Sequence, residues 1–171
     1  MKYKNITKFT SVGSHYYNLS WDGLESTFER YSDGRRGGLE LEPDFQRGHK
    51  WTESQQTAYI EHRLRGGESG KHVYFNAINW MNENPQPLQL VDGLQRITAV
   101  RRYLNNELLA FGVLFKDLEG FNSETVDFII HINNLKTRKE VLTWYIEMNS
   151  GGVVHTSEEI DRVRDLLSEE V

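Results

Sequence analysis

The sequence predicts a single α+β domain, rich in helix and built around a small mixed sheet. At 171 residues the chain has about the length of one domain. Segments in which apolar residues recur every three or four positions, as in helices, alternate with short apolar runs of strand length. Capping boxes and Gly- or Asn-rich stops mark helix ends between them. We expect residues 1–171 to form one domain, with 18–156 as its core and 157–171 as an acidic C-terminal helix.

One helix is expected on each side of an exposed loop in the first third of the chain. Residues 19–31 place apolar side chains at helical spacing. The Gly- and Arg-rich residues 32–38 then break the pattern and predict an exposed loop. Thr52 is followed three residues later by Gln55, which is the signature of a capping box. We therefore expect a helix that begins after Thr52 and stops at Gly66.

Two strands and a further helix are expected in the middle of the chain. Residues 72–78 and 88–91 are short apolar runs that are typical of strands. The second run leads into a tight turn at Asp92 and Gly93, and the helix that follows is expected to end near residues 105–106. A strand, a turn and a helix therefore follow one another directly.

The last third of the chain predicts one extended segment and three helices. Residues 108–115 are apolar and are expected to form a strand or extended segment. A short helix is expected over 123–130, capped by its first serine. A second capping box opens a helix over 137–150, which two glycines end. The final helix, over 157–167, is amphipathic.

The net charge of the chain is unevenly distributed. Lys and Arg number 20 and Asp and Glu number 25, for a formal net charge of −5. Residues 157–171 hold six of the acids and two of the arginines, so the rest of the chain is close to neutral. This balance excludes a generic DNA-coating protein, which carries a strong positive field. It does not exclude a site that binds a few phosphates.

The chain contains no cysteine. A disulfide framework, a thiolate metal site and a cysteine nucleophile are therefore excluded, and a cytoplasmic location is expected. The polar N-terminus does not resemble a secretory signal, and no run approaches the roughly 18 apolar residues that span a membrane. The six histidines lack the spacing of a metal-ligand set. Neither a G-x-S-x-G elbow nor a P-loop is present.

The strongest candidate site is the turn between strand 88–91 and the helix after it. The backbone N–H groups in the first turn of a helix, together with the helix dipole, favour an anion such as phosphate. Arg96 lies in the same turn and could direct two hydrogen bonds onto phosphate oxygens. Asp92 suits a magnesium ligand or a group that orients water. The alternative is that Asp92 only caps the helix and Arg96 pairs with a nearby Glu.

Two other segments are weaker candidates. Residues 149–152 include glycines that permit close approach of the backbone to a ligand, although a helix C-cap is the better explanation of this segment taken alone. The loop 43–52 combines basic or ring-nitrogen side chains with aromatic rings that could stack on a base. Alternatively, these rings are core anchors and the charges are solvated. The side chains concerned are Phe45, Arg47, His49, Lys50 and Trp51.

The three candidate segments occur in an order that resembles one known family. Residues 43–51 look like its P-x-F-Q-R…W box, residues 91–96 like its DGQQR box, and residues 149–152 like its closing LNSGG segment. The family is the N-terminal domain of GmrSD-type, modification-dependent restriction endonucleases, within the ParB/sulfiredoxin-like fold. The resemblance runs from about Leu19 to Leu167. It departs from the family at Leu94, where the DGQQR box usually has Gln.

The resemblance implies a compact ParB-like domain that binds or hydrolyses a nucleoside triphosphate and thereby gates DNA cleavage. Relatives usually carry a C-terminal His-Asn-His-type nuclease domain, which these 171 residues do not contain, so a partner nuclease chain is expected. Sulfiredoxin chemistry is excluded because it needs a cysteine. By position, the resemblance assigns Gln46 and Arg47 to the nucleotide, Asp92, Gly93, Gln95 and Arg96 to the phosphate and metal, and Asn149, Ser150 and Gly151 to the border of the pocket.

The sequence therefore predicts a magnesium-assisted hydrolase in a restriction, defence or mobile-element system. Its substrate would be a nucleoside triphosphate or a DNA phosphodiester. Asp92 would hold the metal or orient water. Arg96 and Arg47 would stabilise charge on the transferred phosphoryl group. Gln46 and Gln95 would position the water or the nucleotide.

The alternative is a non-catalytic DNA-binding or regulatory module that acts on a restriction or partition system. It predicts a DNA affinity that falls steeply with salt, and no metal-dependent turnover. A protein–protein adaptor that docks through the acidic helix 157–171 is a third possibility. In the DNA-binding alternative, basic residues contact the phosphates: Arg35, Arg36, Arg47, Lys50, Arg63, Arg65, Arg101 and Arg102.

Overall fold

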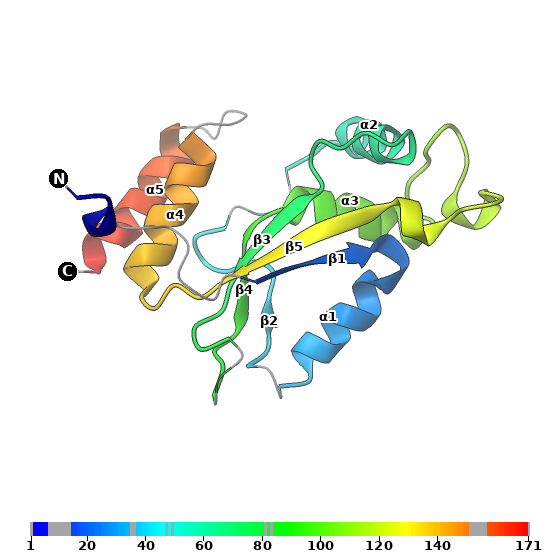
Figure 1. Cartoon of the computed structure of the whole chain (residues 1–171). Coiled ribbons are helices and arrows are strands. Elements are labelled where there is room, and N and C mark those ends of the chain that lie inside the picture. Colours follow the sequence, from blue (N-terminus) through cyan, green and yellow to red (C-terminus); the bar gives the residue numbers. More distant parts are fainter. Residues whose placement is uncertain are drawn as a thin grey trace.

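The structure is a computed structural model that describes residues 2–6, 15–34, 37–46, 48, 50–80, 82, 84–150 and 157–170. These residues form a five-stranded sheet with helices on both of its faces, which confirms the predicted α+β class (Figure 1). The strands are β1 (His15–Ser20), β2 (Leu39–Glu40), β3 (His72–Asn76), β4 (Leu88–Asp92) and β5 (Asp127–Asn133). The helices are α1 (Leu24–Ser32), α2 (Glu53–Leu64), α3 (Leu94–Leu104), α4 (Arg138–Ser150) and α5 (Ser157–Glu169).

The sheet is mixed, and its strands lie in the order β1–β5–β3–β4–β2. β1 runs antiparallel to β5 and β3 runs antiparallel to β4, whereas β5 with β3 and β4 with β2 are parallel pairs. Successive side chains of a strand point to opposite faces of the sheet. Along β5 the buried Phe128, Ile130 and Ile132 share one face. His131 therefore lies on the opposite face.

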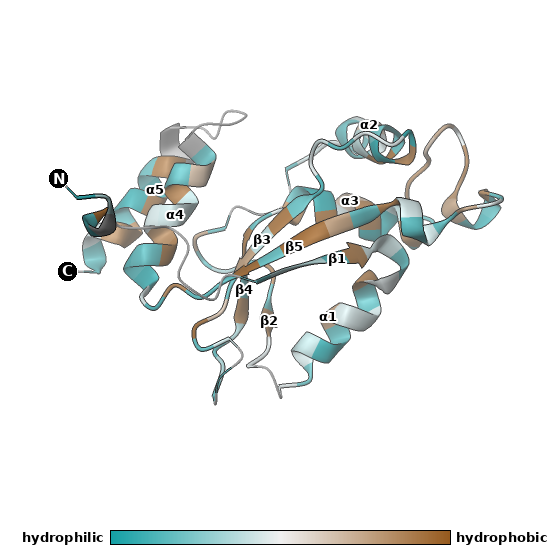
Figure 2. Ribbon diagram, in the orientation of Figure 1, coloured by the Kyte–Doolittle hydropathy of each residue, from teal (hydrophilic) through white to brown (hydrophobic). Residues whose placement is uncertain are grey.

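The larger hydrophobic core lies between the first of these faces and helices α1, α2 and α3. α1 contributes Leu24 and Phe28, α2 contributes Ile60, and α3 contributes Ile97 and Val100. Figure 2 shows hydrophobic residues along β3 and β5, the central strands of the sheet. Full burial of such a side chain contributes about 1.5–3 kcal/mol. This core therefore fixes α3, and with it the predicted phosphate-binding turn, against the sheet.

A smaller core lies on the opposite face of the sheet, between β4 and helices α4 and α5. It contains Val91 of β4, Phe45 of the loop after β2, Tyr145 of α4 and Val163 of α5. The acidic C-terminal helix is thus packed into the fold through its apolar side. Deleting residues 157–171 would expose part of this core.

Both predicted capping boxes are confirmed. The Thr52 hydroxyl accepts a hydrogen bond from the Gln55 N–H at 3.3 Å, and the Gln55 side chain accepts one from the Thr52 N–H at 2.8 Å. Thr137 and Glu140 exchange the same two hydrogen bonds at the start of α4. The predicted stop after α2 is also confirmed, because Gly66 follows with a φ of +83°, which glycine adopts without strain.

The helix predicted over 123–130 is wrong. A short 3₁₀ helix at Ser123–Thr125 leads into strand β5. Val126 and Ile129 are spaced as in a helix, but the residues after them alternate between the two faces of the sheet. The run is also rich in isoleucine, whose branched side chain favours strands. Pairing with β1 and β3 on its two sides stabilises the extended form.

Two other boundaries differ from the prediction. Residues 108–115 form a tight turn, in which Ala110 and Val113 exchange backbone hydrogen bonds of 3.0 Å. The helix predicted over 19–31 begins only at Leu24, because Leu19 belongs to β1. Strand and helix follow each other so closely here that their apolar residues merge into one helical pattern.

Candidate phosphate-binding site

The turn between β4 and α3 is built around a glycine in a conformation that other residues rarely adopt. Gly93 has a φ of +126° and is the N-cap residue of α3. A Cβ atom at this position would lie 2.9 Å from Cγ1 of Val73 on the neighbouring strand β3. The glycine therefore allows α3 to begin directly against the sheet. The N–H groups in the first turn of α3, which have no partners within the helix, consequently lie at the end of β4.

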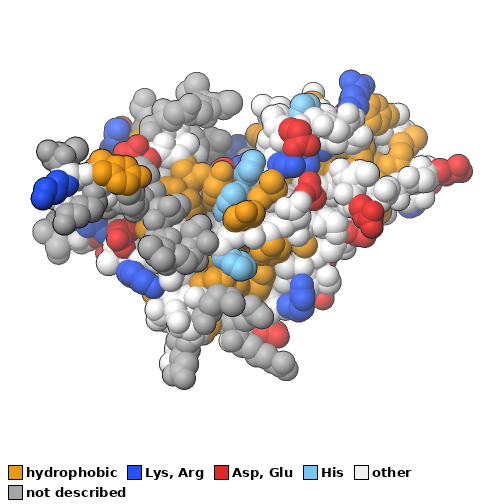
Figure 3. Space-filling model, viewed as in Figure 1, with side chains coloured by type: hydrophobic (Ala, Val, Ile, Leu, Met, Phe, Trp, Pro, Cys, Tyr) orange, Lys and Arg blue, Asp and Glu red, His pale blue; other side chains and the backbone are white. Residues whose placement is uncertain are grey.

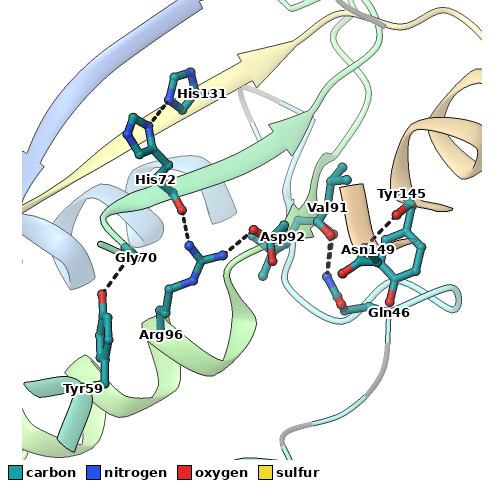
Figure 4. A network of polar contacts seen from close by, with 11 residues as sticks. Gln46, Tyr59, Gly70, His72, Val91, Asp92, Arg96, His131, Tyr145 and Asn149 are labelled. Atoms are coloured by element: carbon teal, nitrogen blue, oxygen red, sulfur yellow. Dashed lines mark hydrogen bonds and ion pairs between the residues drawn. The ribbon is translucent and has the colours of Figure 1, made fainter. Parts of the chain in front are cut away.

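Asp92 and Arg96 form an ion pair at this turn (Figure 4). The Arg96 guanidinium also donates a hydrogen bond of 2.6 Å to the backbone carbonyl of His72, at the start of β3. Arg96 is 16% exposed and Asp92 is 34% exposed, so a ligand from solvent can reach both. The acid that pairs with Arg96 is Asp92 itself rather than a nearby Glu. A phosphate at this turn would therefore share Arg96 with Asp92.

Two glutamine side chains hold the loop 43–51 against this turn. The Gln46 amide donates to the carbonyls of Leu90 and Val91 in β4, at 3.2 and 3.1 Å. The side-chain oxygen of Gln95, in the first turn of α3, accepts the N–H groups of Lys50 and Trp51 at 2.8 and 2.9 Å. The first two predicted segments are thus brought together, and both glutamines bind protein backbone.

Arg47 and His49 belong to this loop but lie outside the described residues. The predicted phosphate contact of Arg47 therefore stays a prediction. The role predicted for Gln46 and Gln95, to position water or nucleotide, also stays a prediction. Their observed hydrogen bonds show that both amides shape the loop.

Gln95→Leu is expected to release the loop from the turn. The substitution removes the acceptor of two backbone N–H groups, and each such hydrogen bond is worth about 1 kcal/mol. We expect the amide hydrogens of Lys50 and Trp51 to exchange with solvent about 10-fold faster or more, because local opening becomes cheaper. Gln86→Leu, an exposed glutamine before β4, is the control. Wild-type exchange rates at both amides in Gln95→Leu would contradict the inference that the Gln95 side chain holds the loop against the turn.

The end of α4 borders the same loop. The ring of Tyr145 lies 5.3 Å from that of Phe45, centre to centre, and shares the smaller core with Val91. Asn149, one turn further along α4, donates its amide to the Tyr145 carbonyl at 2.7 Å. Ser150 is the last residue of α4 and Gly151 lies outside the described residues. The third predicted segment therefore begins one turn beyond the contact of Tyr145 with Phe45, and its role at the border of the pocket stays a prediction.

Trp51 and Tyr59 close the other side of the turn. Their rings are 5.4 Å apart, and Trp51 is half-buried against the larger core. The Tyr59 hydroxyl donates to the carbonyl of Gly70 at 2.9 Å. Burial raises the pKa of this phenol to about 12, against the opposing effect of the Arg96 and Arg63 charges. Trp51 thus serves as a core anchor here, and stacking of a base on it stays a prediction.

The arginines of α3 that were predicted to bind DNA already have partners within the chain. Arg101 donates to both carboxylate oxygens of Glu25, at 2.5 and 3.0 Å. Arg102 donates to the side chains of Gln56 and Glu53, at 2.9 and 3.4 Å. A phosphate would have to compete with these acids for each guanidinium. Their role in DNA binding stays a prediction, and it requires that phosphates displace Glu25 and Glu53 from these arginines.

The other predicted DNA contacts are spread over different environments. Arg63 is buried, and the guanidinium of Arg65 lies 4.8 Å from the centre of the Phe111 ring. Lys50 is exposed on the loop beside the turn. Arg35 and Arg36 lie outside the described residues. These residues do not form one continuous basic face in the described part of the chain.

The donor set at the turn does not make a magnesium site by itself. Asp92 offers carboxylate oxygens, of which one is bonded to Arg96. Among the described residues, no group of three or more His, Asp or Glu side chains is placed to hold a metal ion. Proteins commonly bind Mg²⁺ through one or two carboxylates together with water and substrate phosphates. The magnesium prediction for Asp92 therefore requires ligands beyond those that the described residues supply, and it stays a prediction.

Fold and site together define an α+β domain in which a strand–glycine–helix turn and a clamped loop form one polar site. The family model described as GmrSD restriction endonuclease, N-terminal domain, matches residues 24–134. The chain therefore belongs to this family, which indicates a restriction-related defence system and an interaction with DNA. The match runs from α1 to the end of β5, so it includes the loop and the turn but not α4.

Comparison with characterised proteins and with solved structures gives no match. The ParB-like character of the fold therefore stays a prediction. In the part of the chain that the structure describes, no helix is both long enough and apolar enough to cross a membrane.

Sequence reasoning missed two residues that the structure adds to the surroundings of the site. His72 provides the carbonyl that holds Arg96, and Tyr74 lies directly opposite Asp92 in the β3–β4 pair. Neither residue belongs to a recognised motif. The alternation of polar and apolar residues along 72–76 was the available signal, since it places both on the same face of the sheet.

Proposed function

We propose that this domain binds a nucleoside triphosphate through its phosphates and hydrolyses it, as the nucleotide-handling part of a restriction system. The observation that carries the proposal is the meeting of two distant segments. Gln95 holds the loop 43–51 against the turn that contains Asp92 and Arg96. Both segments lie within the residues that match the family. In this proposal a nuclease outside these 171 residues, on a partner chain, cleaves the DNA.

The described side chains suit the chemistry of phosphoryl transfer to water. The terminal phosphate would lie against the first turn of α3, where N–H groups and Arg96 stabilise charge on its oxygens. Asp92, which Arg96 holds in place, would orient the attacking water and take up its proton. The bond between the terminal phosphorus and the bridging oxygen then breaks. Nucleoside diphosphate and phosphate are the products.

The test is hydrolysis of ATP and GTP by variants of the ion pair, measured as phosphate release with magnesium present. Asp92→Asn and Arg96→Met are each expected to lower the rate about 100-fold or more, the loss typical of removing one stabilising group from a charged transition state. Arg164→Met on α5 is the matched control, because it removes an exposed arginine that pairs with an acid on its own helix at 2.9 Å. Wild-type rates in both site variants would rule out this assignment.

A non-catalytic DNA-binding module is the competing function. The exposed Lys50 beside the turn favours it, whereas the pairing of Arg101 and Arg102 with acids of the chain does not. Such a module would bind DNA with an affinity that falls steeply with salt, and it would release no phosphate from either triphosphate. Measuring both properties on one preparation separates the two functions.

A further inference from the structure

A row of residues crosses the sheet from the proposed phosphate site to the outermost strand. Asp92 of β4 lies directly opposite Tyr74 of β3, Tyr74 lies opposite His131 of β5, and His131 lies opposite Tyr16 of β1. Neighbouring strands are about 4.8 Å apart, so the row is about 14 Å long. A nucleoside triphosphate or a short stretch of single-stranded DNA can span this length.

Two of the three rings of this row, Tyr74 and His131, stack on one another, and the Tyr16 ring lies tilted beside His131. The rings of Tyr74 and His131 have centres 4.6 Å apart and planes 16° apart, and those of His131 and Tyr16 are 6.0 Å and 30° apart. His72 adds a fourth ring, 5.1 Å from His131. We call these four residues the ring row. Neighbouring planes are 16–30° apart, so a further flat ring can pack against the exposed Tyr16 ring at the end of the row.

The ring row is covered at one end and open at the other. At the β3 end, Trp144 of α4 packs edge-on against Tyr74 at 6.1 Å. At the other end, Tyr16 is 71% exposed, and β1 is the outermost strand of the described sheet. Figure 3 shows histidine side chains beside hydrophobic ones in the middle of this face. The outer side of the Tyr16 ring is therefore accessible to a ligand.

The two histidines of the ring row present a polar edge with one hydrogen-bond donor and one acceptor. Nδ1 of His72 and Nε2 of His131 are 2.8 Å apart, so one of them donates a hydrogen bond to the other. Whichever nitrogen donates, the two remaining ring nitrogens of the neutral pair are one donor and one acceptor. The edges of nucleobases carry donors and acceptors side by side in the same way.

Two contacts connect the ring row with the phosphate site. Arg96 donates to the carbonyl of His72, so the same residue anchors the guanidinium and contributes a ring. The pKa of the Tyr74 phenol is raised by burial and also by the charge of Asp92, while Arg96 lowers it. The phenol therefore lies within electrostatic reach of the ion pair.

We infer that the ring row is a subsite for an unpaired nucleobase whose phosphate lies at the Asp92–Arg96 turn. The inference rests on the proposed function and deepens it, because it adds the base to a ligand so far defined by its phosphates. Aromatic rings on an open sheet face are a common means of binding unpaired bases by stacking. The base belongs either to the nucleotide or to a DNA strand, since both offer the same flat ring and phosphate.

The test compares probes with and without a base. Binding of inorganic tripolyphosphate, ATP, GTP and a single-stranded oligonucleotide of about 12 residues is measured for the wild type, Tyr16→Leu and His131→Gln. Tyr3→Leu, another exposed tyrosine, is the matched control. We expect both ring variants to bind the nucleotides or the oligonucleotide about 10-fold more weakly, the range of one lost stacking contact. Binding of tripolyphosphate should not change.

The outcomes separate the two sources of the base and the two proposals. A loss confined to ATP and GTP assigns the base to the nucleotide, and a loss confined to the oligonucleotide assigns it to DNA. Three results would overturn the subsite. The first is equal affinity of the wild type and the ring variants for every base-bearing probe, and the second is a loss of tripolyphosphate binding in the ring variants as large as their loss of base-bearing probes. The third is that the wild type binds no base-bearing probe. A base-dependent affinity without phosphate release would refute hydrolysis but support the subsite.

Discussion

Arg63→Met is expected to destabilise the fold by about 3–5 kcal/mol, the cost of removing one partner from a buried charged network. The Arg63 side chain is 3% exposed and donates to the backbone carbonyls of Gly67 and Asp127, the latter at 2.7 Å. Methionine keeps much of the apolar stem, but it leaves both carbonyls and the nearby Asp127 carboxylate without their charged partner. Since domains are stable by about 5–15 kcal/mol, urea unfolding would show a large shift of the midpoint.

Arg65→Met is the matched control for this prediction. Arg65 lies two residues further along, is exposed and caps the end of α2, so its replacement is expected to change stability by less than about 1 kcal/mol. The double variant Arg63→Met/Asp127→Asn should recover part of the loss, because the carboxylate that Arg63 faces at 3.5 Å is then uncharged. A single Arg63 variant as stable as the Arg65 variant would show that the buried network is dispensable.

Features encoded in neighbouring residues could be predicted from the sequence. The Thr52 and Thr137 capping boxes depend on a partner three residues away, and both are present in the structure. The turn at Asp92 and Gly93 is equally local, because a short strand, a glycine and a helix start follow one another. These signals need no knowledge of distant pairings. They also located Asp92 and Arg96 at the centre of the candidate site, although the ion pair between them was not predicted.

Features that depend on distant pairings could not be predicted in this way. β1 is too polar to be recognised alone, and its Leu19 is buried and its Tyr17 partly buried only because β5 and the helices lie beside it. β2 has two residues, and pairing with β4 is what makes it a strand. The ring row needs two such pairings at once, of β3 with β5 and of β5 with β1. Neither pairing leaves a trace in the local sequence around Tyr16 or His131.

The same limit applies to the charged residues. Arg101 and Arg102 looked like a basic pair available to DNA, because their partners Glu25 and Glu53 are distant in sequence. Gln46 and Gln95 looked like ligand contacts, because the backbone groups that they bind are also distant. A motif therefore locates a site more reliably than it assigns the role of each residue in it. Gln95 shows this most clearly. It belongs to the motif at the turn, but its side chain holds the loop 43–51 in place.

Gly93→Ala is expected to destabilise the fold by about 2–6 kcal/mol and to weaken tripolyphosphate binding. One part of the cost is the φ of +126°, which is strained for alanine by about 1–3 kcal/mol. The other part is the new methyl group, which would lie 2.9 Å from a methyl of the fully buried Val73; overpacking of this kind costs about 1–3 kcal/mol. α3 can relieve the contact only by moving away from β3. That movement would shift Arg96 from the His72 carbonyl.

Gly120→Ala separates the two parts of this cost. Gly120 also has a positive φ, of +70°, but a Cβ there would meet nothing within 4 Å, so we expect a loss of about 1 kcal/mol from strain alone. Gly93→Ala/Val73→Ala keeps the strain and removes the contact, so its loss should be smaller than the sum of the two single losses. Additive losses, or wild-type tripolyphosphate binding by Gly93→Ala, would mean that the close packing of α3 on β3 does not hold Arg96 in place.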